Sequence, residues 1–409
     1  MSQENDRQLP DGWQWVKLRD VCKIVNGSTP SSTIEEYWNG DIIWITPTDL
    51  GKLSSSLITD AARKITKSGY QSCNTEIVPT NSVIISSRAP IGYIGIANIP
   101  LCTNQGCKSL VVTEKIDTWF LYFWLKLSIP VLKSIGKGTT FQEISKSQLT
   151  IFEIPLPPLS EQKRIAAILN EQMEAVEKAR KATEAQLEAA KALPAAYLRA
   201  VFESEEANSW ERRKLGDVCR VTKLAGFEYT KYVNYNPDGK YIALRAQNVR
   251  NTGLDLSNFV KITEDVASYL SRSKLDSGDI VMTFIGANIG EATWIDKNDM
   301  FYCAPNIARI TPNAELIDCQ FLTRLIHSSE FQRQIRDINE STAQQSLSMK
   351  NIRDFWVVFP TLSQQKQIAS TLTEQMQEVE RLKQNLKEQL DTINKLPAVL
   401  LRRAFNGEL

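Results

Sequence analysis

Residues 159–205 read LSEQKRIAAILNEQMEAVEKARKATEAQLEAAKALPAAYLRAVFESE, and residues 362–408 read LSQQKQIASTLTEQMQEVERLKQNLKEQLDTINKLPAVLLRRAFNGE. The two segments align without a gap at an offset of 203 residues, and 21 of the 47 positions are identical. Agreement over such a length indicates an internal duplication, around which the rest of the chain can be read.

Each copy is predicted to form one long helix. In the second copy, apolar and amide side chains recur at alternating steps of three and four residues, a spacing that keeps one side of a helix facing a partner helix. That series comprises Leu372, Gln375, Val379, Leu382, Leu386, Gln389, Ile393 and Leu396. The first copy has a weaker series with several small residues. Two copies of matching length favour an intramolecular antiparallel pair.

The ends of the two helices also carry signals. Ser160 and Ser363 are expected at the N-cap, because a serine side chain can accept a hydrogen bond from the first helical turn. Pro194 and Pro397 are expected to end or kink the helices, since proline has no N–H and clashes with the preceding turn. From Ser160 to Leu193 a helix would span roughly 50 Å at ~1.5 Å per residue.

Length and composition limit the class of protein. With 409 residues, the chain can form two or three domains that each bury a core. No run approaches the ~20 apolar residues of a membrane span, and the polar first residues lack a signal-peptide core. Seven cysteines at irregular spacing fit a reducing compartment better than a disulfide framework. We therefore expect a cytoplasmic protein with no membrane partner.

The overall charge is balanced. The chain has 48 Lys and Arg residues against 47 Asp and Glu residues, which gives a net charge of +1. A generic polyanion binder would have a basic surface throughout, so this class is disfavoured. A local basic cleft is still compatible with these numbers.

The duplication extends beyond the helices. The pattern Trp…Lys-Leu-x-Asp-Val-Cys occurs at residues 13–22 and again at 210–219, and its cysteines, Cys22 and Cys219, are expected to be small core residues. Shorter echoes pair residues 40–49 with 239–248, 83–92 with 281–290, and 139–145 with 342–348. The predicted organisation is a globular unit at 1–158, a helix at 159–205, a second globular unit at 206–361 and a second helix at 362–409.

Each globular unit is predicted to mix helices and strands, so that the fold class is α+β. Short β-branched segments at 42–45, 82–86 and 279–284 are bounded by Gly, Pro, Asn and Ser, as strands are. Segments 119–132 and 319–338 are predicted helices. Similar cores with different intervening loops indicate two copies of one binding fold directed at two targets.

These features resemble the specificity subunit of type I restriction–modification systems. The helix openings PLPPLSEQKRIAAIL and FPTLSQQKQIASTL occur in duplicate. Residues 27–44 contain Gly-Ser-Thr-Pro followed by Tyr-Trp-x-Gly-Asp-Ile-x-Trp, which is similar to the opening of many target-recognition domains in that family. The second unit lacks both elements. The resemblance covers essentially the whole chain.

The resemblance implies a non-catalytic subunit with two α/β target-recognition domains, each reading one half of a split site in double-stranded DNA. The two helices would pack as an antiparallel coiled coil, set the spacer and dock two adenine-N6 methyltransferase (M) subunits, which endonuclease and translocase (R) subunits join. S-adenosylmethionine, ATP and Mg are then expected in the partner subunits, with no cofactor in this chain. A ruler of roughly 50 Å corresponds to at most about 15 base pairs at ~3.4 Å per step.

No catalytic constellation is recognisable in the sequence. The single histidine, His327, lies in a predicted helix and is expected to be a surface or core residue. Residues 135–140, IGKGTT, resemble the end of a phosphate loop, but Val131 stands where such a loop needs its first glycine. The polar clusters offer no metal-ligand spacing.

Candidate DNA contacts are polar and basic residues in the loops. Arg can form two hydrogen bonds with guanine, Asn and Gln can do so with adenine, and Lys, Ser and Thr mostly bind phosphates. In the first unit the candidates are Thr29, Ser31, Tyr37, Trp38, Arg63, Lys64, Lys67, Arg88, Lys137 and Thr139. In the second unit they are Lys223, Tyr229, Arg245, Gln247, Asn248, Arg250, Arg272, Lys274, Asn288, Asn306, Gln344 and Gln345. Trp44, inside a predicted strand, is expected in the core.

Two other classes of protein also account for the repeats. A coiled-coil scaffold with two ligand-binding domains would explain them, although it gives no reason for differently decorated units. A stand-alone DNA-binding regulator would bind its sequence tightly without a methyltransferase.

Overall fold

The structure is a computed structural model, and it describes residues 9–137, 142–223, 228, 231–340 and 346–409. The chain divides into two compact units. Unit 1 comprises Met1–Thr183 and Gln389–Leu409, and unit 2 comprises Glu184–Glu388. Each unit therefore contains the start of one long helix and the end of the other.

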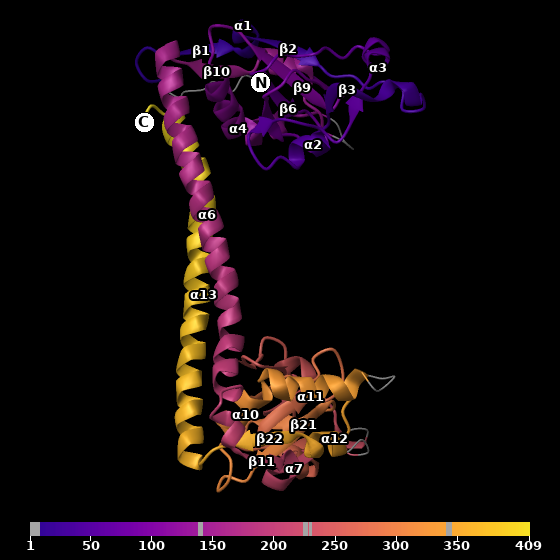
Figure 1. The fold of residues 1–409 in the computed structure, drawn as a ribbon, viewed down its shortest axis with the longest axis vertical. Helices are drawn as coiled ribbons and strands as arrows, with labels where there is room; N and C mark the ends of the chain where they lie inside the picture. Colours follow the sequence, from indigo (N-terminus) through magenta and orange to yellow (C-terminus); the bar gives the residue numbers. More distant parts are fainter. Residues whose placement is uncertain (1–8, 138–141, 224–227, 229–230, 341–345) are drawn as a thin grey trace. The chain divides into compact units, whose positions relative to one another are not determined.

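The elements from the first strand to the first long helix are as follows (Figure 1). They are β1 (Gln14–Lys17), α1 (Leu18–Val21), β2 (Cys22–Asn26), η1 (Glu35–Tyr37), β3 (Trp38–Ile45), α2 (Pro47–Gly51), β4 (Leu57–Ile58), β5 (Lys64–Ile65), α3 (Lys67–Gln71), β6 (Val83–Ser86), β7 (Ile94–Ala97), β8 (Cys102–Thr103), β9 (Cys107–Val112), α4 (Thr118–Ile135), α5 (Lys146–Thr150), β10 (Glu153–Leu156) and α6 (Leu159–Phe202).

The remaining elements repeat much of this order. They are η2 (Ala207–Ser209), β11 (Glu211–Lys214), α7 (Leu215–Val218), β12 (Cys219–Lys223), β13 (Tyr241–Leu244), η3 (Ala246–Asn248), β14 (Val249–Arg250), β15 (Gly253–Leu254), β16 (Val260–Ile262), α9 (Glu264–Tyr269), η4 (Ser271–Ser273), β17 (Lys274–Leu275), β18 (Ile280–Thr283), β19 (Ala292–Trp294), β20 (Phe301–Cys303), β21 (Ile307–Pro312), α10 (Cys319–Ile326), α11 (Ser329–Glu340), α12 (Met349–Asp354), β22 (Trp356–Phe359) and α13 (Leu362–Phe405).

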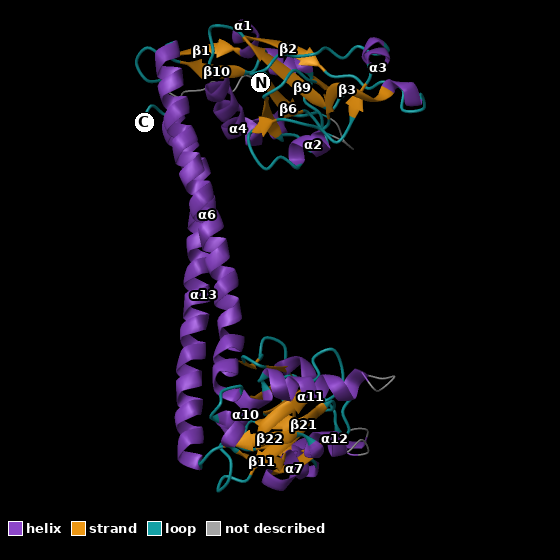
Figure 2. Ribbon diagram, viewed as in Figure 1, coloured by secondary structure: helices purple, strands orange, loops and turns teal. Residues whose placement is uncertain are grey.

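Corresponding sheets form in the two units (Figure 2). Unit 1 has a main sheet in the order β2-β9-β6-β7-β4 and a smaller sheet in the order β5-β3-β8. Unit 2 has a main sheet in the order β12-β21-β18-β19 and a smaller sheet in the order β16-β13-β20-β17. In both small sheets the strand that comes first in the sequence, β3 or β13, pairs antiparallel with one neighbour and parallel with the other. The β-branched segments from which strands were predicted therefore lie in sheets that correspond between the two units.

The echo between residues 40–49 and 239–248 has a steric cause. A Cβ atom at Gly40 would lie 2.5 Å from the Ile65 carbonyl oxygen, and one at Gly239 would lie 2.6 Å from that of Ile262. Only glycine allows the neighbouring strand to approach so closely at either position. The sequence echo thus reflects one structural requirement met twice.

The duplicated helix openings fasten α6 and α13 to the globular parts in the same way. Gln162 is buried, and its amide Nε2 donates to the carbonyl oxygens of Lys115 and Pro157 at 3.1 and 2.9 Å. Gln365 is fully buried and donates to the corresponding carbonyls of Leu316 and Pro360 at 3.0 and 2.9 Å. The LSxQK motif is therefore a structural anchor.

The far ends of the long helices supply aromatic core residues. In unit 1, the Phe405 ring near the end of α13 lies 5.0 Å from Phe120 and 5.1 Å from Trp124, between ring centroids. In unit 2, the equivalent Phe202 at the end of α6 lies 5.6 Å from Phe321 and 6.3 Å from Trp210. Each unit thus completes its core with a residue from the end of the helix that begins in the other unit.

The prolines do not end the long helices, contrary to one of the expected outcomes. Both helices continue for about two turns past Pro194 and Pro397, to Phe202 and Phe405. The lost hydrogen bond is offset because the last turns are held by packing of those phenylalanines in the two cores. Each helix therefore continues through the proline that was expected to end it.

Two further expectations about the helices need correction. Ser160 and Ser363 lie inside the first turn of their helices and not at the N-cap. Thr361 precedes α13, and its hydroxyl donates to Gln364 at 2.7 Å. The predicted helix 319–338 is two helices, α10 and α11, because Ser328 opens a new turn by accepting from the N–H of Phe331 at 3.4 Å.

The predicted seam of α13 is only partly buried. Leu372, Val379 and Leu386 are buried, whereas Leu382 and Leu396 are 42% and 38% exposed. An ideal helix turns by slightly less than a strict seven-residue repeat requires, so one side of a long helix drifts out of a contact seam.

Several single residues behave as the sequence predicts. Trp44 is 3% exposed, and burial raises the pKa of the Cys22 and Cys219 thiols to about 12. His327 is a packed residue whose Nε2 lies 2.7 Å from the Ala292 carbonyl oxygen. Across the described ranges, every helix is too short or too polar to cross a lipid bilayer.

Candidate nucleic-acid interface

One edge of the unit 1 main sheet gathers several of the predicted DNA contacts. Strands β2 and β6 both run antiparallel to β9, so the ends of β2 and β6 meet the start of β9 at one edge. The loop after α4 joins them, because the N–H of Ile144 donates to the Ser87 carbonyl oxygen at 3.0 Å. We name this region, residues 27–31, 87–92, 104–108, 137 and 143, the unit 1 edge surface.

Two cations of the unit 1 edge surface share one carboxylate. Arg88, just after β6, lies with Nη1 3.5 Å from Oε2 of Glu143. Lys108, near the start of β9, lies with Nζ 3.5 Å from Oε1 of the same residue. Lys108 is buried, and its other contact is the Gln105 carbonyl oxygen at 3.3 Å. Arg88, Lys108 and Glu143 together carry a net charge of +1.

The Gly-Ser-Thr-Pro loop is tied to the small sheet of unit 1. The indole N–H of Trp44 donates to the Ser28 carbonyl oxygen at 3.0 Å, and that of Trp38 donates to the Ser31 carbonyl oxygen at 3.1 Å. The Thr29 hydroxyl donates to the Gln105 side chain. The two parts of the motif are thus one structural element, which leaves Thr29 and Ser31 exposed on a fixed backbone.

Arg63 is held by stacking. Its guanidinium carbon lies 3.6 Å from the ring centre of Trp38 and 5.5 Å from that of Trp44, and the two rings meet edge to face at 5.1 Å. Within the described part of the chain, no carboxylate pairs with it. A guanidinium fixed over an aromatic ring keeps its in-plane N–H donors available for another partner.

The other candidates near the unit 1 small sheet differ in their exposure and in whether they already have a partner. Lys64 pairs with Asp60 at 3.2 Å, and Lys67 is exposed in the first turn of α3. Tyr37 is half-buried, and its carbonyl oxygen accepts from the Thr66 N–H at 3.0 Å. Lys137 is exposed on the edge surface.

Unit 2 builds the same edge with different side chains. Strands β12 and β18 end where β21 begins, and the N–H of Leu347 donates to the Phe284 carbonyl oxygen at 2.9 Å, as Ile144 does to Ser87 in unit 1. We name residues 223, 284–290, 306 and 346 the unit 2 edge surface. It brings together Lys223, Asn288 and Asn306 from the predicted set.

Two residues of the unit 2 edge surface have defined geometry. The Lys223 ammonium lies 5.4 Å from the ring centre of Phe284. Asn306 has a positive φ of 73° and presents its carbonyl oxygen to the Phe284 N–H at 3.0 Å. Its exposed side chain is therefore carried on a sharp turn that asparagine tolerates better than most residues.

A second group of candidates surrounds the unit 2 small sheet. Arg245 contacts the Asn258 side chain at 3.5 Å, and Gln247 donates to the Asn258 carbonyl oxygen at 3.3 Å. Asn248 is 1% exposed, and its amide donates to the carbonyl oxygens of Asp255 and Asn258 at 2.8 Å each. In this conformation the Asn248 side chain cannot contact DNA and instead fixes the turn that carries its neighbours.

Three more cations of unit 2 differ in charge balance. Arg250 pairs with Glu291 at 3.1 Å, and Lys274 pairs with Asp299 at 2.5 Å. The hydrogen bond from Lys274 lowers the pKa of the Asp299 carboxyl. Arg272 is exposed, without an ion pair among the residues that the structure describes. Thr139, Tyr229, Gln344 and Gln345 lie outside the described residues.

Sequence reasoning missed Lys108 and Glu143. Both belong to the region that only the sheet topology brings together, because Lys108 lies on a strand and Glu143 follows a helix. The duplication carried part of a signal, since the echo between residues 139–145 and 342–348 pairs Glu143 with Ser346, whereas Lys108 pairs with Ala308 only through strand register. A charge gained at two equivalent positions of one unit alone indicates a function specific to that unit.

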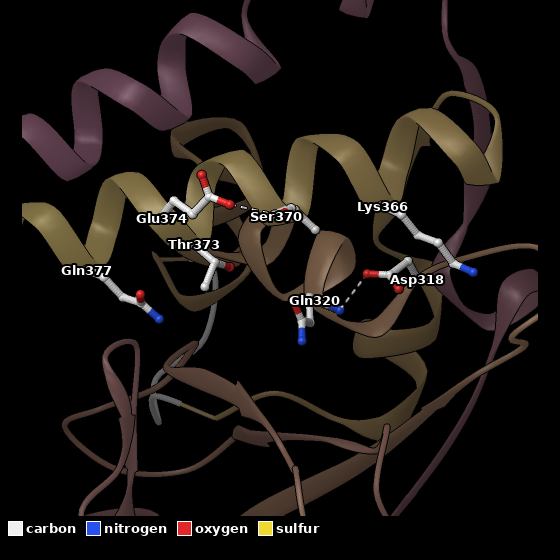
Figure 3. A pocket seen from close by; sticks show the side chains of 8 residues that line it. Asp318, Gln320, Lys366, Ser370, Thr373, Glu374 and Gln377 are labelled. Carbon is white, nitrogen blue, oxygen red and sulfur yellow. Dashed lines mark hydrogen bonds between the residues drawn. The ribbon is translucent and has the colours of Figure 1, made fainter.

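Unit 2 also has a shallow polar groove between α10 and α13 (Figure 3). The groove has a volume of about 360 Å³ and is lined by Asp318, Gln320, Lys366, Ala369, Ser370, Thr373, Glu374 and Gln377. Its side chains combine hydroxyls, amides and charges of both signs. Over the described segments, no group of His, Cys, Asp and Glu residues could hold a metal ion.

Comparison with known proteins identifies relatives over nearly the whole chain. The family model described as the type I restriction modification DNA specificity domain matches residues 10–188 and 208–392. The MjaIX specificity subunit of Methanocaldococcus jannaschii is 34% identical over 229 residues, which are 52% of this chain and 53% of that protein. The MjaVIII specificity subunit of the same organism is 24% identical over 412 residues, which are 95% and 91% of the two chains.

Solved structures share the fold. The HsdS subunit from Thermoanaerobacter tengcongensis matches with a TM-score of 0.68 and 19% identity, covering 100% of both chains. A chain from a study of the assembly of a type I restriction–modification system matches with a TM-score of 0.71 and 18% identity, covering 98% and 100%. The mixed α/β architecture with two repeated domains is thus that of these structures.

Proposed function

Because this chain belongs to the family of type I restriction–modification DNA specificity subunits, we propose that it reads a split, asymmetric DNA sequence, one half-site for each unit. The pair of edge surfaces supports this proposal best. Their backbones are fixed by equivalent hydrogen bonds, from Ile144 to Ser87 and from Leu347 to Phe284, while their exposed side chains differ. One scaffold with two sets of contacts suits two unlike half-sites.

The candidate contacts fall into two classes by charge. Arg63 and Lys223 are stacked on rings, and Lys67, Lys137 and Arg272 are exposed. These five cations are available to bases or phosphates. Lys64, Arg250 and Lys274 already have carboxylate partners, so their contribution to affinity is expected to be small.

The partners follow from the family. Its specificity subunits are non-catalytic and assemble with methyltransferase and endonuclease subunits. We extend this to two adenine-N6 methyltransferase (M) subunits and to endonuclease and translocase (R) subunits, which would hold S-adenosylmethionine, ATP and Mg. This chain would supply sequence recognition, and the methylated adenine would be presented to the partner's catalytic site.

The long helices are proposed to form an antiparallel coiled coil that sets the unread spacer and docks the M subunits. Each helix is 44 residues long, which corresponds to ~66 Å at ~1.5 Å per residue. Exposed charges on both helices, at Glu171, Glu174, Glu378 and Arg381, form the proposed docking surface.

The test is co-expression of the full chain with the methyltransferase subunit of its own system, followed by mapping of N6-methyladenine in the host DNA. One split, asymmetric methylated motif is the expected result. A stable complex that methylates no such motif would contradict the proposal and favour the scaffold reading. Tight, sequence-specific binding by the chain without its partner would favour the regulator.

A further inference from the structure

We propose that Arg88 and Lys108 form a binding site for a DNA backbone phosphate, and that the Glu143 carboxylate occupies this site until DNA binds. The proposal rests on the function proposed above and adds Lys108 and Glu143, which sequence reasoning did not single out. Glu143 and a phosphate of the DNA backbone would thus compete for the same two cations.

The distances show that the carboxylate is loosely held. Glu143 lies 3.5 Å from both Arg88 and Lys108, whereas a charge-assisted N–H···O bond is normally about 2.7–2.9 Å. Exposed pairs elsewhere in the chain reach that range, for instance Arg164 with Glu161 at 2.7 Å. One carboxylate between two cations satisfies neither of them fully.

Burial of Lys108 makes an anion necessary at this place. The Lys108 side chain is 7% exposed, and the only other acceptor near its ammonium among the described residues is the Gln105 carbonyl oxygen. An ammonium removed from water is costly unless an anion neutralises it. A phosphodiester carries the same single negative charge as the carboxylate and has two non-bridging oxygens, so it can replace Glu143 and contact both cations.

The position fits the DNA backbone. Arg88 and Lys108 lie on the unit 1 edge surface, together with the exposed Thr29. Phosphate contacts fix the register of a protein on the duplex, whereas base contacts provide specificity. A phosphate held here would place the neighbouring side chains over the adjoining bases.

The unit 2 edge surface lacks the equivalent charges. Ser346 stands at the position of Glu143 and forms a β-bridge with Ile285, which follows β18 as Arg88 follows β6. Ala308 takes the place of Lys108, since β9 and β21 occupy the same position in their sheets. All three charges are absent together, as expected if they serve one ligand of unit 1.

The experiment uses the full chain in complex with its methyltransferase subunit. Affinity is measured between 50 and 200 mM salt for a duplex with the methylated motif and for a scrambled duplex. The variants are Arg88→Gln, Lys108→Met and Glu143→Gln. Lys23→Met is the control, because it removes a lysine of the same sheet that pairs with Glu76 at 2.6 Å. Thermal unfolding verifies that each variant is folded.

The three variants should shift affinity on both duplexes alike. Glu143→Gln should bind several-fold more tightly at low salt, because the competing carboxylate is removed. Arg88→Gln and Lys108→Met should bind more weakly, and the slope of log K against log salt should fall by about 0.9. With a slope smaller by this amount, raising the salt from 50 to 200 mM should weaken the binding of the variant about threefold less than it weakens the binding of the wild type. The control should leave the slope unchanged.

Several results would overturn the inference. One is a Glu143→Gln complex that binds no more tightly than the wild type. Another is an Arg88→Gln complex that loses preference for the motif with an unchanged salt slope, which would make Arg88 a base reader. If Lys108→Met does not fold, the other two variants decide. Stabilisation of the wild type by inorganic phosphate, with DNA binding of every variant unchanged, would assign the site to free phosphate.

Failure of the proposed function looks different. In that case the wild-type complex would not distinguish any motif from the scrambled duplex. A wild type that does distinguish them, combined with variants that behave like the wild type, contradicts only the phosphate site.

Discussion

The side-chain oxygen of Gln162 accepts a hydrogen bond from the backbone N–H of Asp117 at 2.8 Å, while the Asp117 carboxylate caps α4. One buried glutamine therefore ties the first turn of α6 to the first turn of α4. Gln365 and Asp318 repeat the arrangement at 2.9 Å with α13 and α10. The most recognisable repeat in the sequence is thus explained by stability.

Replacing either glutamine should destabilise its own unit. Gln162→Ala or Gln365→Ala leaves one buried N–H and two buried carbonyls without partners, and we expect a loss of about 2–4 kcal/mol. Chemical denaturation of the complex would measure this loss. Gln367→Ala, at an exposed position two residues further along α13, is the control. Equal effects of Gln365→Ala and the control would exclude the anchor.

The terminal phenylalanines should be as important as the anchors. Phe405→Ala removes a ring that packs between Phe120 and Trp124, and large core truncations of this kind cost about 3–5 kcal/mol. Phe202→Ala should do the same to unit 2. Tryptophan fluorescence during urea denaturation reports both changes. Val399→Ala, at a position that is 46% exposed, should leave the transition within about 0.5 kcal/mol.

Much of the fold could be predicted because it is repeated. The helix openings, the echo at Gly40 and Gly239, and the buried strands recur for steric reasons that act locally. The continuation of the helices past Pro194 could not be predicted, because it depends on where Phe202 packs. The split of one predicted helix into α10 and α11 depends instead on the Ser328 hydroxyl, which accepts from the N–H of Phe331.

The candidate site was less predictable than the fold. Loop residues such as Thr29 and Lys223 can be chosen by chemistry and position. Asn248 satisfies the same criteria, yet it is buried, because its amide completes a turn whose carbonyls come from later in the chain. Lys108 was missed since a lysine on a strand gives no sign of which loop it will face.

Arg63 is expected to read the first half-site, with Trp38 as its support. Arg63→Ala should weaken methylation of the motif about tenfold or more and relax one base of that half-site, since a good bidentate contact contributes about 1–3 kcal/mol of discrimination. Trp38→Ala should relax the same base, because the stacked guanidinium loses its platform. Mapping of N6-methyladenine measures both effects.

Lys64→Ala is the matched control for Arg63. The Lys64 side chain is already paired with Asp60, so the motif should remain unchanged. If Arg63→Ala preserved the motif as fully as Lys64→Ala, or if the second half-site changed, Arg63 would not be the reader assigned here.

The stability of unit 2 should depend on pH through His327. Burial lowers the pKa of this imidazole from 6.5 to about 4. Between these two pH values the imidazole is protonated in the unfolded chain but neutral in the folded chain. The free energy of unfolding therefore falls as the pH drops from about 6.5 to about 4, by at most about 1.4 kcal/mol per pH unit. Above pH 6.5 this contribution to stability is constant.

A glutamine at position 327 isolates this effect. His327→Gln has no titrating ring, so its urea midpoint should depend less on pH between 6.5 and 4 than that of the wild type. Carboxylates affect both proteins equally, and the difference between the two curves measures His327. Parallel curves would show that the ring titrates normally in the folded chain.

Shortening both long helices should shorten the unread spacer. Deleting seven residues from each of α6 and α13 removes ~10.5 Å of helix, which corresponds to about three base pairs. The methylated motif should keep both half-sites and lose about three unread positions between them. A deletion in only one helix should abolish methylation, because the pair would no longer match. An unchanged spacer in the double deletion would exclude the ruler.

The exchange of helix ends between units affects the order in which the two units can fold. Unit 2 is one continuous stretch, Glu184–Glu388, whereas unit 1 needs residues from Gln389–Leu409. Phe405 can pack beside Trp124 only after the whole of unit 2 has been synthesised. The half that is synthesised first must therefore wait with an open core, and the half that is synthesised second can close before it.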